Sequence, residues 1–228
     1  MPTQDTSRSG PLSGMRVVEM ASKGPAPYCG MMLSDMGADV VRIDRISALS
    51  RRYVHYVDPM SRGRRSIAVD LKTPAGVATI RRLVALSDCL IEGYRPGVME
   101  RLGLGPSECL ADNSRLVYGR VTGWGQEGPL AQAAGHDLNY IAQAGALGLI
   151  GAKDGTPVIP QNLIADYAGG GMHGAIGVMM ALFAREKTGR GQLVDIAMMD
   201  GSMYLITQFL SAYYGSGEIP ERGNSFAG

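Results

Sequence analysis

The chain has few cysteines and no cysteine pattern. Cys29, Cys89 and Cys109 are scattered, odd in number and free of CxxC or Cys–His spacing. This distribution argues against a disulfide framework and provides no zinc-binding motif. We therefore expect no metal site and a reducing, cytoplasmic location.

Long apolar runs and an excess of charge of one sign are also missing. No run of about 18 apolar residues occurs, and the polar start MPTQDTSRSGPLSG lacks the apolar core of a signal peptide. The formal net charge is only +1, so nothing favours a nucleic acid or an anionic membrane as partner. We expect a soluble protein without a membrane span, in which a local cluster of basic residues would have to hold any anionic ligand.

Several cofactor and hydrolase motifs are absent too. The first predicted strand runs into MASKGPAPYCG and not into the GxGxxG of dinucleotide-binding proteins. GxxxxGK[ST], HExxH and GxSxG do not occur either. The chain is therefore a poor candidate for a P-loop protein, a zincin or an α/β-hydrolase, and we expect no NAD or FAD.

What the sequence does contain is a regular alternation of strand-like and helix-like segments. Runs rich in β-branched residues alternate with apolar stripes at helical spacing, which predicts an α/β fold with a parallel sheet covered by helices on both faces. The expected strands are 15–20, 38–43, 66–71, 89–94, 115–121 and 192–198. The expected helices are 27–37, 73–88 and a long one opened by Asp166 and ending near Gly189.

Ligands of such sheets gather at the carboxyl ends of the strands, so the loops after residues 20, 43, 71, 94 and 121 are where we expect chemistry. Basic residues follow several of these strands, in positions where they can bind phosphate groups. They are Arg42, Arg45, Lys72, Arg95 and Arg101. Taken singly, each is equally consistent with solvated surface. The basic loop 46–65 is the segment expected to be most mobile.

Two ionisable residues beside glycines stand out as candidate catalytic groups. His136 lies in AGHDLNY, after the Gly-punctuated loop TGWGQEGP, and Asp166 precedes a GGG run. Their ordinary alternatives are a structural histidine and a helix N-cap, and Asp137 has the same N-cap alternative. Three adjacent glycines are costly inside a helix, which indicates either close packing or the approach of a ligand. Of the other histidines, we expect His173 to be packed and His55 to be solvated.

Taken together, these segments resemble the family III CoA-transferase and α-methylacyl-CoA racemase superfamily. The likeness runs through LSDMGADVVRIDR, DLKTPAG, LIEGYRPGVMERLGLGP, VTGWGQEGP, GHDLNY, ADYAGGGM and TGRGQLVDIAMMDGS. GHD is similar to the racemase branch, because the transferases usually carry another residue where His136 stands. The resemblance implies a Rossmann-like large domain without the nucleotide fingerprint, and interlocked dimers with active sites between subunits.

The resemblance also implies residue roles. His136 and Asp166 would form the catalytic pair, and a second set would hold CoA and its thioester, CoA being part of the substrate and not a cofactor. That second set is Arg45, Val69, Asp70, Leu71, Lys72, Gly93, Tyr94, Arg95, Arg101, Gly135, Asp137, Leu138, Asn139 and Tyr140.

In the racemase interpretation His136 and Asp166 exchange a proton with the carbon next to the thioester, one on each face. N–H groups at the Gly-rich start of the Asp166 helix would stabilise the enolate oxygen. In a transferase, Asp166 would instead be a nucleophile and His136 incidental. A third possibility is an inactive fragment that only binds CoA.

The length of the chain sets the expected domain organisation. Family members are considerably longer, and the end ERGNSFAG is turn-rich, without a closing helix or strand. We expect a disordered start over 1–12, a Rossmann-like CoA-binding catalytic domain over 13–215, and the start of a linker to a missing smaller domain over 216–228. A glutamate that supports the catalytic histidine in the racemases would lie beyond residue 228.

Overall fold

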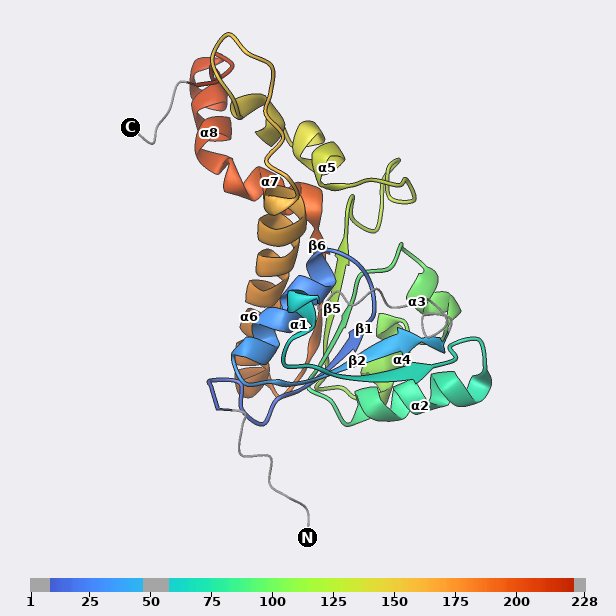
Figure 1. The fold of residues 1–228 in the computed structure, drawn as a ribbon. Helices are drawn as coiled ribbons and strands as arrows, with labels where there is room; N and C mark the ends of the chain where they lie inside the picture. The colour runs from blue at the N-terminus through green and yellow to red at the C-terminus, as the bar shows by residue number, and fades with distance from the viewer. Residues whose placement is uncertain (1–8, 47–57, 224–228) are drawn as a thin grey trace.

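A six-stranded parallel sheet forms the centre of the protein. The computed structural model describes residues 9–46 and 58–223, and Figure 1 shows the chain path. The strands are β1 (Arg16–Met20), β2 (Asp39–Arg45), β3 (Arg65–Val69), β4 (Cys89–Glu92), β5 (Val117–Thr122) and β6 (Gln192–Ala197). Their order is β3-β2-β1-β4-β5-β6, and all five pairings are parallel. This confirms the predicted fold class, and the order is that of Rossmann folds.

Helices cover both faces of the sheet. In Figure 1, α1 and α6 lie on one side of the sheet and α2 and α4 on the other, while α5, α7 and α8 gather beyond the end of β6. The α-helices are α1 (Pro25–Asp35), α2 (Pro74–Ala85), α3 (Val98–Arg101), α4 (Pro106–Asp112), α5 (Asp137–Gln143), α6 (His173–Thr188), α7 (Met198–Leu205) and α8 (Thr207–Ser216). Short 3-10 turns are η2 (Pro59–Ser61) and η3 (Ala146–Leu149), and η4 (Leu163–Met172) is π-helical.

Two hydrophobic cores lie on the two faces of the sheet. Consecutive strand residues point to opposite faces, so Val17 packs with α1 and α6 whereas Val18 packs with α2. Val117 and Tyr118 of β5 divide in the same way. Burial on both faces explains why these strands read as continuous apolar runs and not as alternating ones.

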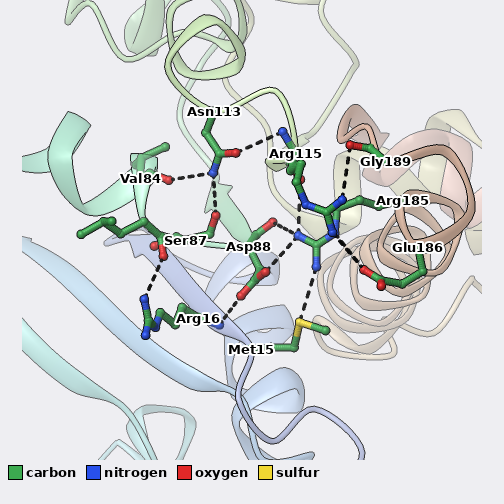
Figure 2. A network of polar contacts seen from close by, with 11 residues as sticks. Met15, Arg16, Val84, Ser87, Asp88, Asn113, Arg115, Arg185, Glu186 and Gly189 are labelled. Atoms are coloured by element: carbon green, nitrogen blue, oxygen red, sulfur yellow. Dashed lines mark hydrogen bonds and ion pairs between the residues drawn. The ribbon is translucent and has the colours of Figure 1, made fainter.

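A buried arginine joins several elements at the amino end of the sheet. Arg185, near the end of α6, is only 3% exposed and pairs with Asp88 at 3.0 Å. Its guanidinium also donates to the carbonyl oxygens of Asp88 and Arg115, and Asp88 accepts the N–H of Arg16. Figure 2 shows these contacts converging from three strand starts on one side chain. They fix the amino end of the sheet, opposite the strand ends where we expect the site.

The main departure from the predicted elements concerns the long helix. It begins at Leu163 and not at Asp166, and its first ten residues are π-helical. Asp166 therefore lies inside the first turn, so its interpretation as an N-cap is wrong. Strand β4 ends at Glu92, two residues earlier than predicted, since Gly93 begins a loop.

The boundary expected at residue 12 lies too late. Leu12 is buried in the core, and its N–H donates to the carbonyl oxygen of Met36. The other domain bounds stay a prediction. His55, most of the basic loop 46–65 and the ends 1–8 and 224–228 lie outside the described residues.

The continuous helical segment Leu163–Thr188 is long and apolar enough, by length and composition only, to cross a membrane. In this fold η4 and α6 pack against α1, α7 and β5, and 44% of the segment's most apolar window is buried. One face of the segment therefore belongs to the core of the domain.

Candidate active site

The candidate site lies at the carboxyl ends of the strands, where the strand order reverses between β1 and β4. The loops after these two strands face each other there, which is where open parallel sheets bind ligands. Residues from the loops after β1, β2, β3, β4 and β5 line a set of adjoining cavities. The loops in which we expected chemistry thus border these cavities.

One cavity of about 260 Å³ contains His136. Tyr94 and Arg95 from the loop after β4 line it, as do Trp124 and Tyr140. The rings of Trp124 and Tyr140 meet edge to face with centroids 4.7 Å apart. The imidazole is exposed, so a ligand that enters this cavity can reach it.

A cationic cavity of about 570 Å³ adjoins the first, sharing Lys23, Gly93, Tyr94 and Arg95 with it. Arg45 lines this second cavity, with its guanidinium 5.0 Å from the centre of the Tyr94 ring. Among the described residues no carboxylate pairs with Lys23, Arg45 or Arg95, so their charges are available to an anionic ligand.

Two further cavities extend this path along the ends of β3 and α2. The residues predicted to hold CoA that line them are Arg45, Val69, Asp70, Leu71, Lys72 and Arg101. Gly93, Tyr94, Arg95, Gly135 and Tyr140 line the first two cavities. Eleven residues that are distant in the sequence thus follow one path from Arg101 towards His136.

Asp137 connects the two candidate catalytic residues. It follows His136 in the chain and is only 3% exposed. Its Oδ2 accepts the N–H groups of Ala165 at 2.7 Å and Asp166 at 2.8 Å. A single carboxylate therefore holds the backbone of Asp166 next to the start of α5.

The carboxylate of Asp166 faces the loop after β1. A side chain built at Gly24 would come within 3.3 Å of Asp166 Oδ2, and Asn162 donates to the same oxygen at 3.3 Å. Burial and, to a smaller degree, the Asp137 carboxylate raise the pKa of Asp166, while the Asn162 hydrogen bond and nearby His136 lower it. The influences that favour the neutral form thus outweigh those that favour the charged form. Asp166 does not line the cavity that contains His136, but its neighbours across the loop, Lys23 and Pro25, do.

The GGG run serves close packing. Side chains at Gly169, Gly170 and Gly171 would collide with α7, Pro25 and Tyr28 respectively. The N–H groups of Ala165 and Asp166 are already engaged by Asp137. These two N–H groups are therefore not free to bind an enolate, and the expectation that the helix start supplies such donors stays a prediction for its other N–H groups.

Three residues expected to hold CoA have other positions. The carboxylate of Asp137 is bonded to backbone inside the protein, and Asn139 Oδ1 accepts the N–H of His136 at 2.9 Å. Leu138 is exposed on α5. None of the three lines the cavities described here, because a helix presents successive residues in different directions.

Lys23 and Asn162 were not predicted as site residues. Lys23 lines two of the cavities, and Asn162 is the hydrogen-bond donor to Asp166. Lys23 follows the first strand, so its position was a usable signal. Nothing in the sequence pairs Asn162 with Asp166 before the π-helix is known.

Comparison with known proteins defines the family. The model of CoA-transferase family III matches residues 12–227. The chain belongs to CoA-transferase family III. It is 46% identical to the mouse protein named alpha-methylacyl-CoA racemase and 48% identical to its human counterpart, over 85% of this chain in each case. It covers 49% and 50% of those two proteins, so it spans about half the length of these relatives.

A solved structure agrees with the fold. The chain superimposes on a CAIB/BAIF family protein from Brucella suis with a TM-score of 0.84 at 31% identity. The match covers 93% of this chain and 60% of that one. The family III sheet and its helices are thus present in this chain.

Proposed function

We propose that the protein carrying this chain interconverts (R)- and (S)-2-methylacyl-CoA thioesters. The observation that carries the proposal is the position of His136 in a cavity that adjoins the cationic cavity of Arg45 and Arg95. A thioester bound along this path places its phosphates among the cations and its acyl end towards His136. The similarity to two proteins named as racemases supports the same reaction.

In the proposed mechanism His136 removes the proton from the carbon next to the thioester. The bonding electrons move into the thioester and form an enolate, and Asp166 returns a proton to the opposite face. In the reverse direction the two residues exchange roles. Burial raises the pKa of Asp166, which favours the protonated acid that this mechanism needs. No cofactor is proposed, because CoA is part of the substrate.

The test uses an enantiopure 2-methylacyl-CoA in D2O without an acceptor acid. We expect deuterium at C2 together with loss of optical purity, and we expect His136→Ala to reduce exchange at least 100-fold. His173→Ala is the matched control, since this histidine only packs near Tyr204, and it should exchange at the parent rate. Exchange that starts only when a carboxylic acid is added would indicate a transferase and contradict the proposal.

We also propose that the protein forms a homodimer in the cytoplasm. Large apolar side chains are exposed on α6, α7 and α8, among them Met180 (67%), Phe183 (65%) and Tyr214 (80%). An exposed apolar surface of this kind favours association. Sedimentation equilibrium should give twice the chain mass, and Phe183→Glu should shift the equilibrium towards monomer.

A further inference from the structure

A buried carboxylate stands at the end of β4, directly beside the proposed site. Glu92 is only 5% exposed, and its partner across the sheet is Arg120 of β5. The Arg120 guanidinium instead pairs with Asp195 at 2.9 Å and Glu100 at 3.5 Å. In the described part of the chain, no cation lies within ion-pair distance of Glu92. Tyr118 of β5 is the other titratable side chain nearby.

The hydrogen bond that Glu92 does accept leads into the site. Its Oε2 accepts the backbone N–H of Tyr94 at 2.7 Å. Tyr94 and Arg95 line both the cavity of His136 and the cationic cavity. The guanidinium of Arg45 also lies over the Tyr94 ring. A single acceptor, Glu92 Oε2, therefore holds the backbone at Tyr94. Tyr94, Arg95 and the Arg45 guanidinium over the Tyr94 ring are the three groups of the proposed binding path that depend on this position.

The two flanks of this loop have their own contacts. Gly93 packs so closely on the loop after β1 that an added Cβ would lie 2.9 Å from Ser22 Oγ. At the other flank, the carbonyl oxygen of Pro96 accepts from Gln132 at 3.3 Å. The hydrogen bond to Glu92 holds the segment between these two contacts.

Burying a carboxylate without a cation opposes folding, so stability of the fold does not account for Glu92. We propose that Glu92 is a positioning residue. By accepting the Tyr94 N–H, its carboxylate holds the loop 93–96 in the shape in which Tyr94 and Arg95 bind the CoA part of a thioester. The inference rests on the proposed function only in taking a CoA thioester as the ligand.

The protonation state of Glu92 supports this role. Burial raises the pKa of Glu92 to about 7, the Tyr94 N–H and Arg120 lower it, and Glu100 and Asp195 raise it. An ionised carboxylate accepts a stronger hydrogen bond than a neutral one. The loop is therefore held most firmly above pH 7, and affinity for CoA should decrease as the pH falls through about 7.

The test measures binding of CoA by calorimetry between pH 6 and 8. Glu92→Met keeps the length of the side chain and removes the acceptor, and we expect CoA to bind about tenfold more weakly at pH 8. Glu92→Gln keeps a carbonyl oxygen for Tyr94, so it should restore most of the affinity. Because glutamine does not titrate, this variant should also lose the part of the pH dependence that Glu92 contributes. For the racemisation itself, Glu92→Met should raise KM and change kcat little.

Glu100→Gln is the control, because Glu100 also pairs with Arg120 but is exposed and does not contact the loop. At pH 8, where Glu92 is ionised in both proteins, it should bind CoA like the parent protein. A folded Glu92→Met variant with parent affinity would overturn the proposal. If that variant does not fold, an unchanged pH dependence in Glu92→Gln would overturn it equally. CoA binding without racemisation would contradict the proposed function and leave the role of Glu92 intact.

Discussion

At the scale of single residues, the decisive feature is how buried carboxylates hold backbone. Asp137 accepts two N–H groups of η4, and Glu92 accepts one from the loop after β4. Neither side chain has to contact a substrate in order to matter, because each holds the backbone of residues proposed to do so. In the proposed function the reactive group in GHD is histidine, while the adjacent aspartate holds the backbone of η4.

We predict that Asp137→Ala will lower kcat at least tenfold, because the backbone of Asp166 loses both bonds to Oδ2. The two N–H groups would be left unpaired inside the protein, which should reduce the free energy of unfolding by about 2 kcal/mol. Hydrogen–deuterium exchange at C2 and urea denaturation measure the two effects. Asp137→Asn keeps an acceptor oxygen and should be affected less. Parent values for Asp137→Ala in both measurements would refute this role.

At the scale of elements, the site depends on the contact between η4 and α7. These two helices approach so closely that a Cβ at Gly201 would lie 2.0 Å from the carbonyl oxygen of Gly169. Because backbone packs against backbone there, no flexible side chain can move to make room for an added methyl group. The small residues that follow Asp166 thus determine where the π-helical turn sits.

We predict that Gly201→Ala will lower the free energy of unfolding by about 3 kcal/mol, as overpacking does in tight cores. Gly174→Ala in α6 is the matched control, since its added Cβ would meet no atom closer than 3.6 Å. That variant should be neutral or more stable by up to about 1 kcal/mol, because alanine favours the helix. Chemical denaturation compares the two. If both variants changed the free energy of unfolding equally, the close approach of η4 and α7 would not be the reason for a glycine at position 201.

At the scale of the whole molecule, the contacts that stabilise the sheet and the cavities of the candidate site lie at opposite ends of the strands. Its amino end is held by Arg185 and the surrounding carbonyl groups (Figure 2), and its carboxyl end carries the cavities. The helical connections between the parallel strands bring loops that are far apart in the sequence together at this carboxyl edge.

We predict that Arg185→Met will destabilise the fold by about 3 kcal/mol, because removing one partner of a buried ion pair leaves Asp88 and two carbonyl oxygens without it. Arg115→Met should cost less than about 1 kcal/mol, since the Arg115–Glu186 pair is exposed. Thermal unfolding measures both. CoA affinity should change in neither variant, and a loss confined to binding would contradict the separation of the two ends.

The sequence by itself determined the α/β class, the parallel sheet and the family. These depend on local signals, namely β-branched runs, helical spacing and ordered motifs, which a single chain displays directly. It also determined His136 as the candidate that distinguishes a racemase from a transferase. The sequence-based interpretations that the structure corrected also came from local signals. The N-cap alternative for Asp166 arose because aspartate before a glycine-rich helix usually caps it.

Only the tertiary structure decided where Asp166, Asp137 and Glu92 lie and which groups they bond to. A π-helical start, a carboxylate that bonds to backbone 29 residues away and a buried strand-end glutamate arise from contacts between segments that no periodicity predicts. The sequence left open whether the GGG run makes room for a ligand or for a neighbouring helix. The structure shows that α7 packs against it. Packing and burial, which depend on the whole fold, set the positions and hydrogen bonds of these residues.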